Sequence, residues 1–289
     1  MAALLALASA ICYGVSDFSG GLAARRSPAI AVVLVSNALS LVLALLTVAL
    51  LPGSAYSGRD LLWGVAAGTV GLLGVVLLYR GLAIGPMSVV APLTAVLSAI
   101  VPVVVGTVRG ERPGVVAVAG VVLAIPAMVL ISREGRGLDV EGRPSRRAPR
   151  LTGAAVGSAL CAGVSFGGFY VLLAQTGPDG GAWPLVGQRA ASVAILLALS
   201  AAALLRGGRI LPTGALMLAT VAGLTDFLAN LAYVSATHRG LLALVAVLSS
   251  LYPATTVLLA RAVLRERLGR QQVGGLVLAG AAVTLIAIH

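Results

Sequence analysis

The sequence has too few charged residues to coat a water-soluble globule. Only 10% of its 289 residues are charged, and lysine is absent altogether, whereas a soluble domain carries about 25% charged residues. Hydrophobic residues make up 59% of the chain, and its mean hydropathy is +1.06. We therefore expect an all-α polytopic membrane protein, surrounded by the lipid bilayer.

Cysteines and aromatic residues are also scarce. Two cysteines form neither a disulfide framework nor a zinc site, and aromatics at 4% are too few to stack on single-stranded nucleic acid. A P-loop is absent as well, which excludes ATP-driven transport by this chain alone. We expect no metal or cofactor. We also expect no nucleic-acid partner, because arginines in membrane loops explain the net charge of +11.

Ten apolar segments are each long enough to cross the hydrocarbon core, which takes about 20 helical residues. Short connections rich in Gly, Pro and Arg separate them, except for one longer charged segment at 133–150, which we interpret as a linker. The predicted spans are residues 2–23, 29–51, 61–82, 86–108, 113–132, 151–174, 184–205, 213–235, 240–261 and 271–288.

The two halves of the chain, 1–132 and 151–289, resemble each other. "CYGVS" at 12–16 recurs as "CAGVS" at 161–165, and "GERPGVVAVAGVVLA" at 110–124 recurs as "RERLGRQQVGGLVLA" at 265–279. A duplicated unit with five spans must enter the membrane from the opposite side in its second copy. We therefore predict two inverted five-helix repeats around a shared midplane cavity, an architecture of many secondary transporters.

Arginine placement predicts the orientation of the chain. When Arg80 and Arg261, near the C-terminal ends of their spans, are counted with the loops that follow, odd-numbered spans are followed by 15 arginines and even-numbered spans by 4. The positive-inside rule then puts the 133–150 linker in the cytoplasm and both termini outside.

With this pattern the chain resembles the drug/metabolite transporter superfamily, in particular its ten-helix members with two EamA-type domains. The two halves and the "GERPG" and "RERLG" turns before the last helix of each half carry the resemblance. It implies a multi-pass carrier of the plasma or inner membrane, a monomer or homodimer, rather than an enzyme. Such a carrier moves a small metabolite, amino acid or drug-like compound by alternating access. The resemblance also implies a cavity lined by the first, third and fourth helices of each half, and cytoplasmic termini in many members, against the arginine count.

Two spans carry an acid on a polar stripe. A carboxylate at the bilayer centre costs roughly 2.5–3.5 kcal/mol on insertion scales and tends to mark function. Helical spacing puts each acid on one face with other polar side chains, which must face protein or water. These substrate-binding or ion-coupling candidates are Tyr13, Ser16 and Asp17 on the first span, and Asp226, Asn230 and Tyr233 on the eighth.

Asp17 resembles, in its helix and approximate depth, a glutamate that exchanges protons for substrate in the small four-helix drug exporters of the superfamily. Proton-coupled efflux through Asp17 is therefore a hypothesis. The alternative is that each acid only forms local hydrogen bonds, as a cap or a bridge between helices.

Further candidates lie on other spans. Asn37 and Arg189, which align with each other in the repeat, are also candidates for substrate binding or ion coupling. Arg189 is expected to bind an anionic group, to pair with an acid or to snorkel to the interface. Pro92 and Pro253 each remove a backbone hydrogen bond and are candidate gating kinks. Glu111 and Glu266 are expected to organise loops.

Two other functional classes remain open at this point. A non-transporting scaffold or lipid-handling protein would share the same composition. An intramembrane aspartyl protease would also use two acids, and "GLTDF" at 223–227 is similar to the GxGD signature of those enzymes, although threonine replaces its second glycine.

Overall fold

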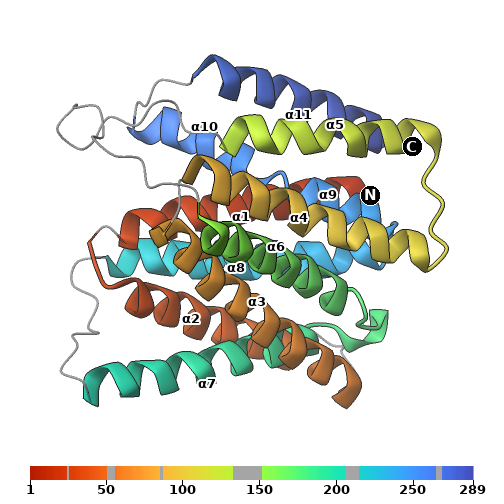
Figure 1. Ribbon diagram of the computed structural model, residues 1–289. Coiled ribbons are helices and arrows are strands. Elements are labelled where there is room, and N and C mark those ends of the chain that lie inside the picture. The colour runs from red at the N-terminus through yellow and green to blue at the C-terminus, as the bar shows by residue number, and fades with distance from the viewer. Residues whose placement is uncertain are drawn as a thin grey trace, which may run out of the picture. The chain divides into compact units, whose positions relative to one another are not determined.

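A computed structural model of the chain is shown in Figure 1. Among the residues that it describes, ten helical spans are long and apolar enough to cross a membrane. Within the described part of the chain all regular structure is helical. The predicted linker at 133–150 and Glu266 lie outside the described residues. The structure describes residues 1–24, 26–50, 56–84, 87–132, 152–205, 215–264 and 269–288.

The helices agree with the predicted spans to within three residues at each end. The first half holds α1 (Ala2–Ala24), α2 (Ala29–Leu50), α3 (Gly58–Ile84), α4 (Met87–Val108) and α5 (Val115–Ser132). The second half holds α6 (Gly153–Leu173), a short 3₁₀ turn η1 (Pro178–Gly180), α7 (Trp183–Leu205), α8 (Leu216–Thr237), α9 (Leu242–Ser249), α10 (Tyr252–Leu264) and α11 (Arg270–Ile288).

The ninth span is broken, whereas the fourth is continuous. α9 ends at Ser249 and α10 begins at Tyr252, so that Pro253 lies in the first turn of α10, where its missing N–H leaves no helical bond unmade. Pro92 lies inside α4, which continues past it. Only the ninth of these two spans is thus interrupted near its proline. A gating role for Pro92 and Pro253 stays a prediction.

The helices pack into two compact units. Unit 1 comprises Met1–Thr69 and Leu172–Arg239, and unit 2 comprises Val70–Val171 and Gly240–His289. Each unit therefore takes helices from both halves of the sequence. This division by packing differs from the repeats 1–132 and 151–289, which remain a prediction about the sequence.

Unit 1 contains α1, α2, α7, α8 and the first part of α3. Small residues let α8 lie close to two neighbours: Gly20 of α1 faces the Ala222 methyl group, and a side chain at Gly223 would collide with the Ser36 backbone of α2. Such small-residue contacts are typical of membrane helices, since lipid provides no hydrophobic drive for their association. They bring polar side chains of α1, α2 and α8 within reach of one another.

In unit 2, α5 lies along α11 (Figure 1), and α4 packs against α5 and α9. The end of α4 is a Schellman motif: Gly110 has φ +90°, Glu111 N–H donates to the Gly106 carbonyl, and Gly110 N–H donates to the Thr107 carbonyl. This turn sets the direction of the "GERPG" segment and of the Glu111 side chain.

Glu111 caps a helix in the other half of the sequence. Its Oε1 accepts from Leu242 N–H at 2.7 Å and its Oε2 from Ala243 N–H at 3.0 Å, at the start of α9. The N-cap residue of α9, Leu241, has no side chain that could do this. The carboxylate satisfies amides that a helix leaves unpaired at its N-terminus, and its charge complements the helix dipole.

Replacing Glu111 with alanine is expected to lower the free energy of unfolding by about 1.5–3 kcal/mol, because it removes charge-assisted bonds from two amides. Thermal unfolding of the purified protein measures this loss, with Arg112→Gln, an exposed neighbour, as the matched control. Gly106→Ala should act through the same carboxylate, since the new methyl group would collide with Glu111 Oε2. The two changes should therefore be less than additive; equal melting of Glu111→Ala and the control would contradict the cap.

Candidate functional site

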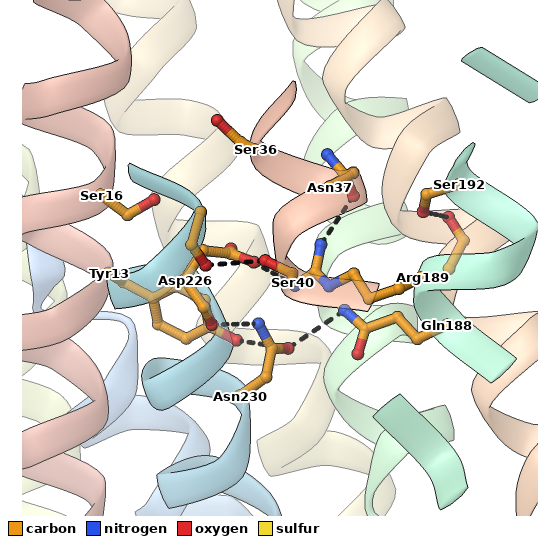
Figure 2. A network of polar contacts seen from close by, with 12 residues as sticks. Tyr13, Ser16, Ser36, Asn37, Ser40, Gln188, Arg189, Ser192, Asp226 and Asn230 are labelled. Carbon is orange, nitrogen blue, oxygen red and sulfur yellow. Dashed lines mark hydrogen bonds and ion pairs between the residues drawn. The ribbon is translucent and has the colours of Figure 1, made fainter. Parts of the chain in front are cut away.

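Polar side chains from four helices of unit 1 meet in one cluster (Figure 2). α1 and α2 come from the first half of the sequence, and α7 and α8 come from the second. We call the connected side chains the polar cluster: Tyr13, Asn37, Gln188, Arg189, Asp226 and Asn230.

The charged part of the polar cluster is an ion pair. Arg189 is only 7% exposed; its Nη2 pairs with Asp226 Oδ2, and its Nη1 donates to Asn37 Oδ1 at 2.8 Å. Asn37 in turn donates from Nδ2 to the Val33 carbonyl at 2.8 Å, which fixes its oxygen toward the arginine. Of the roles considered for Arg189, the structure shows pairing with an acid.

Arg189 and Asn37 occupy equivalent positions of the two predicted repeats, and the structure brings them into direct contact although 152 residues separate them. Equivalent residues of two repeats can touch only close to the axis that relates those repeats. The contact is therefore what an inverted duplication predicts for its central helices.

The neutral part of the polar cluster centres on Asn230, which is 1% exposed. Its Oδ1 accepts from Tyr13 Oη at 3.0 Å and from Gln188 Nε2 at 3.1 Å, and its Nδ2 donates to the Asp226 carbonyl at 2.8 Å. Gln188 Oε1 is buried and has no hydrogen-bond partner among the described residues. The cluster thus holds one buried acceptor that is not satisfied.

Two levels of contacts follow from the directions of the helices. Tyr13 meets Asn230 and Gly20 meets Ala222, so α1 and α8 run antiparallel. Asp17 lies midway between Tyr13 and Gly20 and is therefore at the level of Asp226. One level holds Tyr13, Asn230 and Gln188, and the next, one helical turn away, holds the ion pair and Asp17.

Asp17 differs from Asp226 in its surroundings. It is exposed, and it forms no hydrogen bond or ion pair with the residues that the structure describes. It interacts electrostatically with Asp226. When both carboxylates are ionised, they and Arg189 together carry a net charge of −1.

Serine hydroxyls hold the helices around the cluster together. Ser16 donates to the Ala222 carbonyl at 2.9 Å, so this predicted site residue joins α1 to α8. Ser36 and Ser40, one turn apart on α2, donate to the Ala219 and Gly223 carbonyls at 2.9 and 2.7 Å. The i, i+4 serines in "SNALS" at 36–40 were the available sequence signal for this second contact.

The remaining predicted residues lie elsewhere. Tyr233 is fully buried on α8, while Pro92 and Pro253 belong to unit 2 and are not part of the polar cluster. The described residues include no group of three or more His, Cys, Asp or Glu side chains that could hold a metal ion.

Comparison with known proteins gives a family and a fold. The EamA-like transporter family matches residues 1–133 and again residues 153–288. One solved structure, titled "Crystal structure of protein", is 16% identical with a TM-score of 0.69, and the match covers 99% of this chain and 96% of that one. At this identity it shows the fold alone. No curated protein matches the chain.

The two family matches cover nearly the whole chain and coincide with its two halves, each with five spans. The chain is therefore a ten-helix membrane protein of the drug/metabolite transporter superfamily and belongs to the EamA-like transporter family.

Proposed function

We propose that this membrane transporter is a secondary carrier that exports a small metabolite, amino acid or drug-like compound from the cell by alternating access. In this proposal the polar cluster and Asp17 form the substrate site in the cell membrane. Asp17 takes up and releases a proton during the cycle. The break between α9 and α10, together with Pro92 in α4, allows the helices to bend as access changes sides.

The observation that carries the proposal is the buried charge. Arg189 and Asp226 form an ion pair inside membrane-spanning helices, with a second carboxylate at the same level. Packing alone does not need such a group, because well-packed apolar residues in place of a buried ion pair are often neutral or stabilising. Ionisable residues within spans face protein or water and mark substrate and ion pathways.

The buried ion pair and the nearby carboxylate also argue against a non-transporting scaffold and against an intramembrane aspartyl protease. A scaffold has no use for an unpaired carboxylate beside a buried ion pair. An aspartyl protease needs two carboxyls that share a proton as acid and base, whereas Asp226 is bound to the Arg189 guanidinium. Transport explains both the pair and the free acid.

A screen of cells that express the protein tests this function. We expect increased export of, or resistance to, at least one compound, and loss of that effect in the Asp17→Asn/Asp226→Asn variant. Asp179→Asn removes an exposed acid of the same unit outside the spans and is the matched control. A protein that changes the export of no compound, or a double variant as active as Asp179→Asn, would overturn the proposal.

A further inference from the structure

We infer that the compounds this carrier moves are organic amines without a carboxylate, which place their ammonium group on Asp17 and a second donor on Gln188 Oε1. This inference rests on the proposed function and goes one step further, because it chooses between the amino acids, amines and other metabolites that remained open. It comes from counting which groups of the site already have partners and which do not.

The donors of the polar cluster are already directed at acceptors within the protein. The two terminal nitrogens of Arg189 face Asp226 and Asn37, and the Gln188 amide nitrogen faces Asn230. The amide nitrogens of Asn37 and Asn230 both donate to carbonyls of their own helices. Each of these nitrogens therefore already has an acceptor, whereas Asp17 and Gln188 Oε1 have no donor among the described residues.

The unsatisfied groups are acceptors. Asp17 is exposed and has no hydrogen-bond or ion-pair partner within the described chain, and its carboxylate can accept up to four bonds. Gln188 is 3% exposed, yet its Oε1 accepts no bond from any described residue. Buried acceptors normally have a partner, so an orphan one beside a substrate site points to a donor that the ligand brings.

The net charge of Arg189, Asp226 and Asp17 indicates the sign of the charge that the ligand carries. Asp226 neutralises Arg189, so that the Asp17 carboxylate, when it is ionised, is the excess charge at this level. A cation restores neutrality within the low-dielectric span, where charge interactions are strong. A substrate carboxylate would meet repulsion from Asp17, and the nearest cation is engaged by two partners.

The spacing of the two acceptors limits the shape of the ligand. Asp17 is one helical turn from Tyr13, and Tyr13 and Gln188 bind the same oxygen of Asn230. The two acceptors thus lie on adjacent levels, about 5.4 Å apart along the helix axis. An amine whose second N–H or O–H donor lies several bonds from its ammonium group can bridge this axial offset together with the lateral distance between α1 and α7.

Matched pairs of compounds that differ only in the carboxylate test the inference directly. Purified protein in liposomes is given tyramine or tyrosine, cadaverine or lysine, and agmatine or arginine, each radiolabelled. We expect uptake of the amine to exceed that of the amino acid at least tenfold in one or more pairs. Asp17→Asn should reduce amine uptake at least tenfold, while Asp179→Asn leaves it unchanged.

The proposed contact between the ligand and Gln188 Oε1 is tested by a separate measurement. Gln188→Met keeps the size of the side chain and removes the acceptor, so it should lower the preference for cadaverine over pentylamine, which lacks the second donor. Because both amines are compared on the same variant, a partial loss of folded protein does not alter the ratio.

Equal or better uptake of the amino acids overturns the inference and leaves the carrier function standing. Failure of every amine to enter also overturns it, and the export screen described above then decides separately whether the protein transports another compound through Asp17. An unchanged cadaverine preference in Gln188→Met would remove Gln188 from the site.

Discussion

Replacing Arg189 with methionine is expected to abolish transport and to lower the free energy of unfolding by about 3–5 kcal/mol. The change leaves the Asp226 carboxylate inside the membrane without its guanidinium partner and leaves Asn37 Oδ1 without a donor. Two carboxylates would then lie at one level with no cation between them. Thermal unfolding of the detergent-solubilised protein and uptake in liposomes measure the two effects.

A double variant separates folding from function. Arg189→Met/Asp226→Leu removes both charges, so its stability should return to near that of the wild type, while transport stays lost. Arg189→Lys keeps the charge but not the planar guanidinium that reaches Asp226 and Asn37 together. Its stability should therefore lie between those of the single and double variants. If the single variant were as stable as the double variant, the ion pair would not be the buried interaction that we describe.

Replacing Asp17 with asparagine is expected to reduce transport at least tenfold but, unlike Arg189→Met, to leave the free energy of unfolding almost unchanged. The side chain makes no hydrogen bond or ion pair with described residues, so its loss removes no structural contact. Substitutions of this kind usually change the free energy of unfolding by less than about 0.5 kcal/mol. Uptake and melting temperature are measured on the same preparation, beside Asp226→Asn, which should lose both.

Two results would contradict this assignment. A destabilised Asp17→Asn protein would mean that the carboxylate has a structural partner. Full transport by a stable Asp17→Asn protein would mean that neither proton exchange nor substrate binding uses the acid. Asp17→Glu, which retains the charge on a longer side chain, should keep part of the activity.

Much of the fold was predictable because its signals are local. Hydropathy located ten spans, and helical spacing put Tyr13 and Asp17, like Asp226 and Asn230, on common faces. The inverted duplication followed from an odd number of spans per half. The family matches agree with that division.

The partners of these residues were not predictable, since they depend on which helices pack together. Tyr13 and Asn230 are 217 residues apart, and the α1–α8 contact that joins them leaves no periodic signal in either segment. The same holds for Gln188, whose unsatisfied oxygen is visible only once Asn230 has taken its amide nitrogen. Arg189 could be given three roles from sequence, and its position beside Asp226 selects one.

The cap formed by Glu111 limits which substitutions the two halves of the chain can accept. Its carboxylate is encoded in the first half, and the helix start that it completes is encoded in the second. The ion pair region likewise combines α2 from one half with α7 and α8 from the other. A substitution at one of these positions in either half therefore removes a contact of the other half. We expect substitutions in the two halves to be tolerated only when they are compatible with each other.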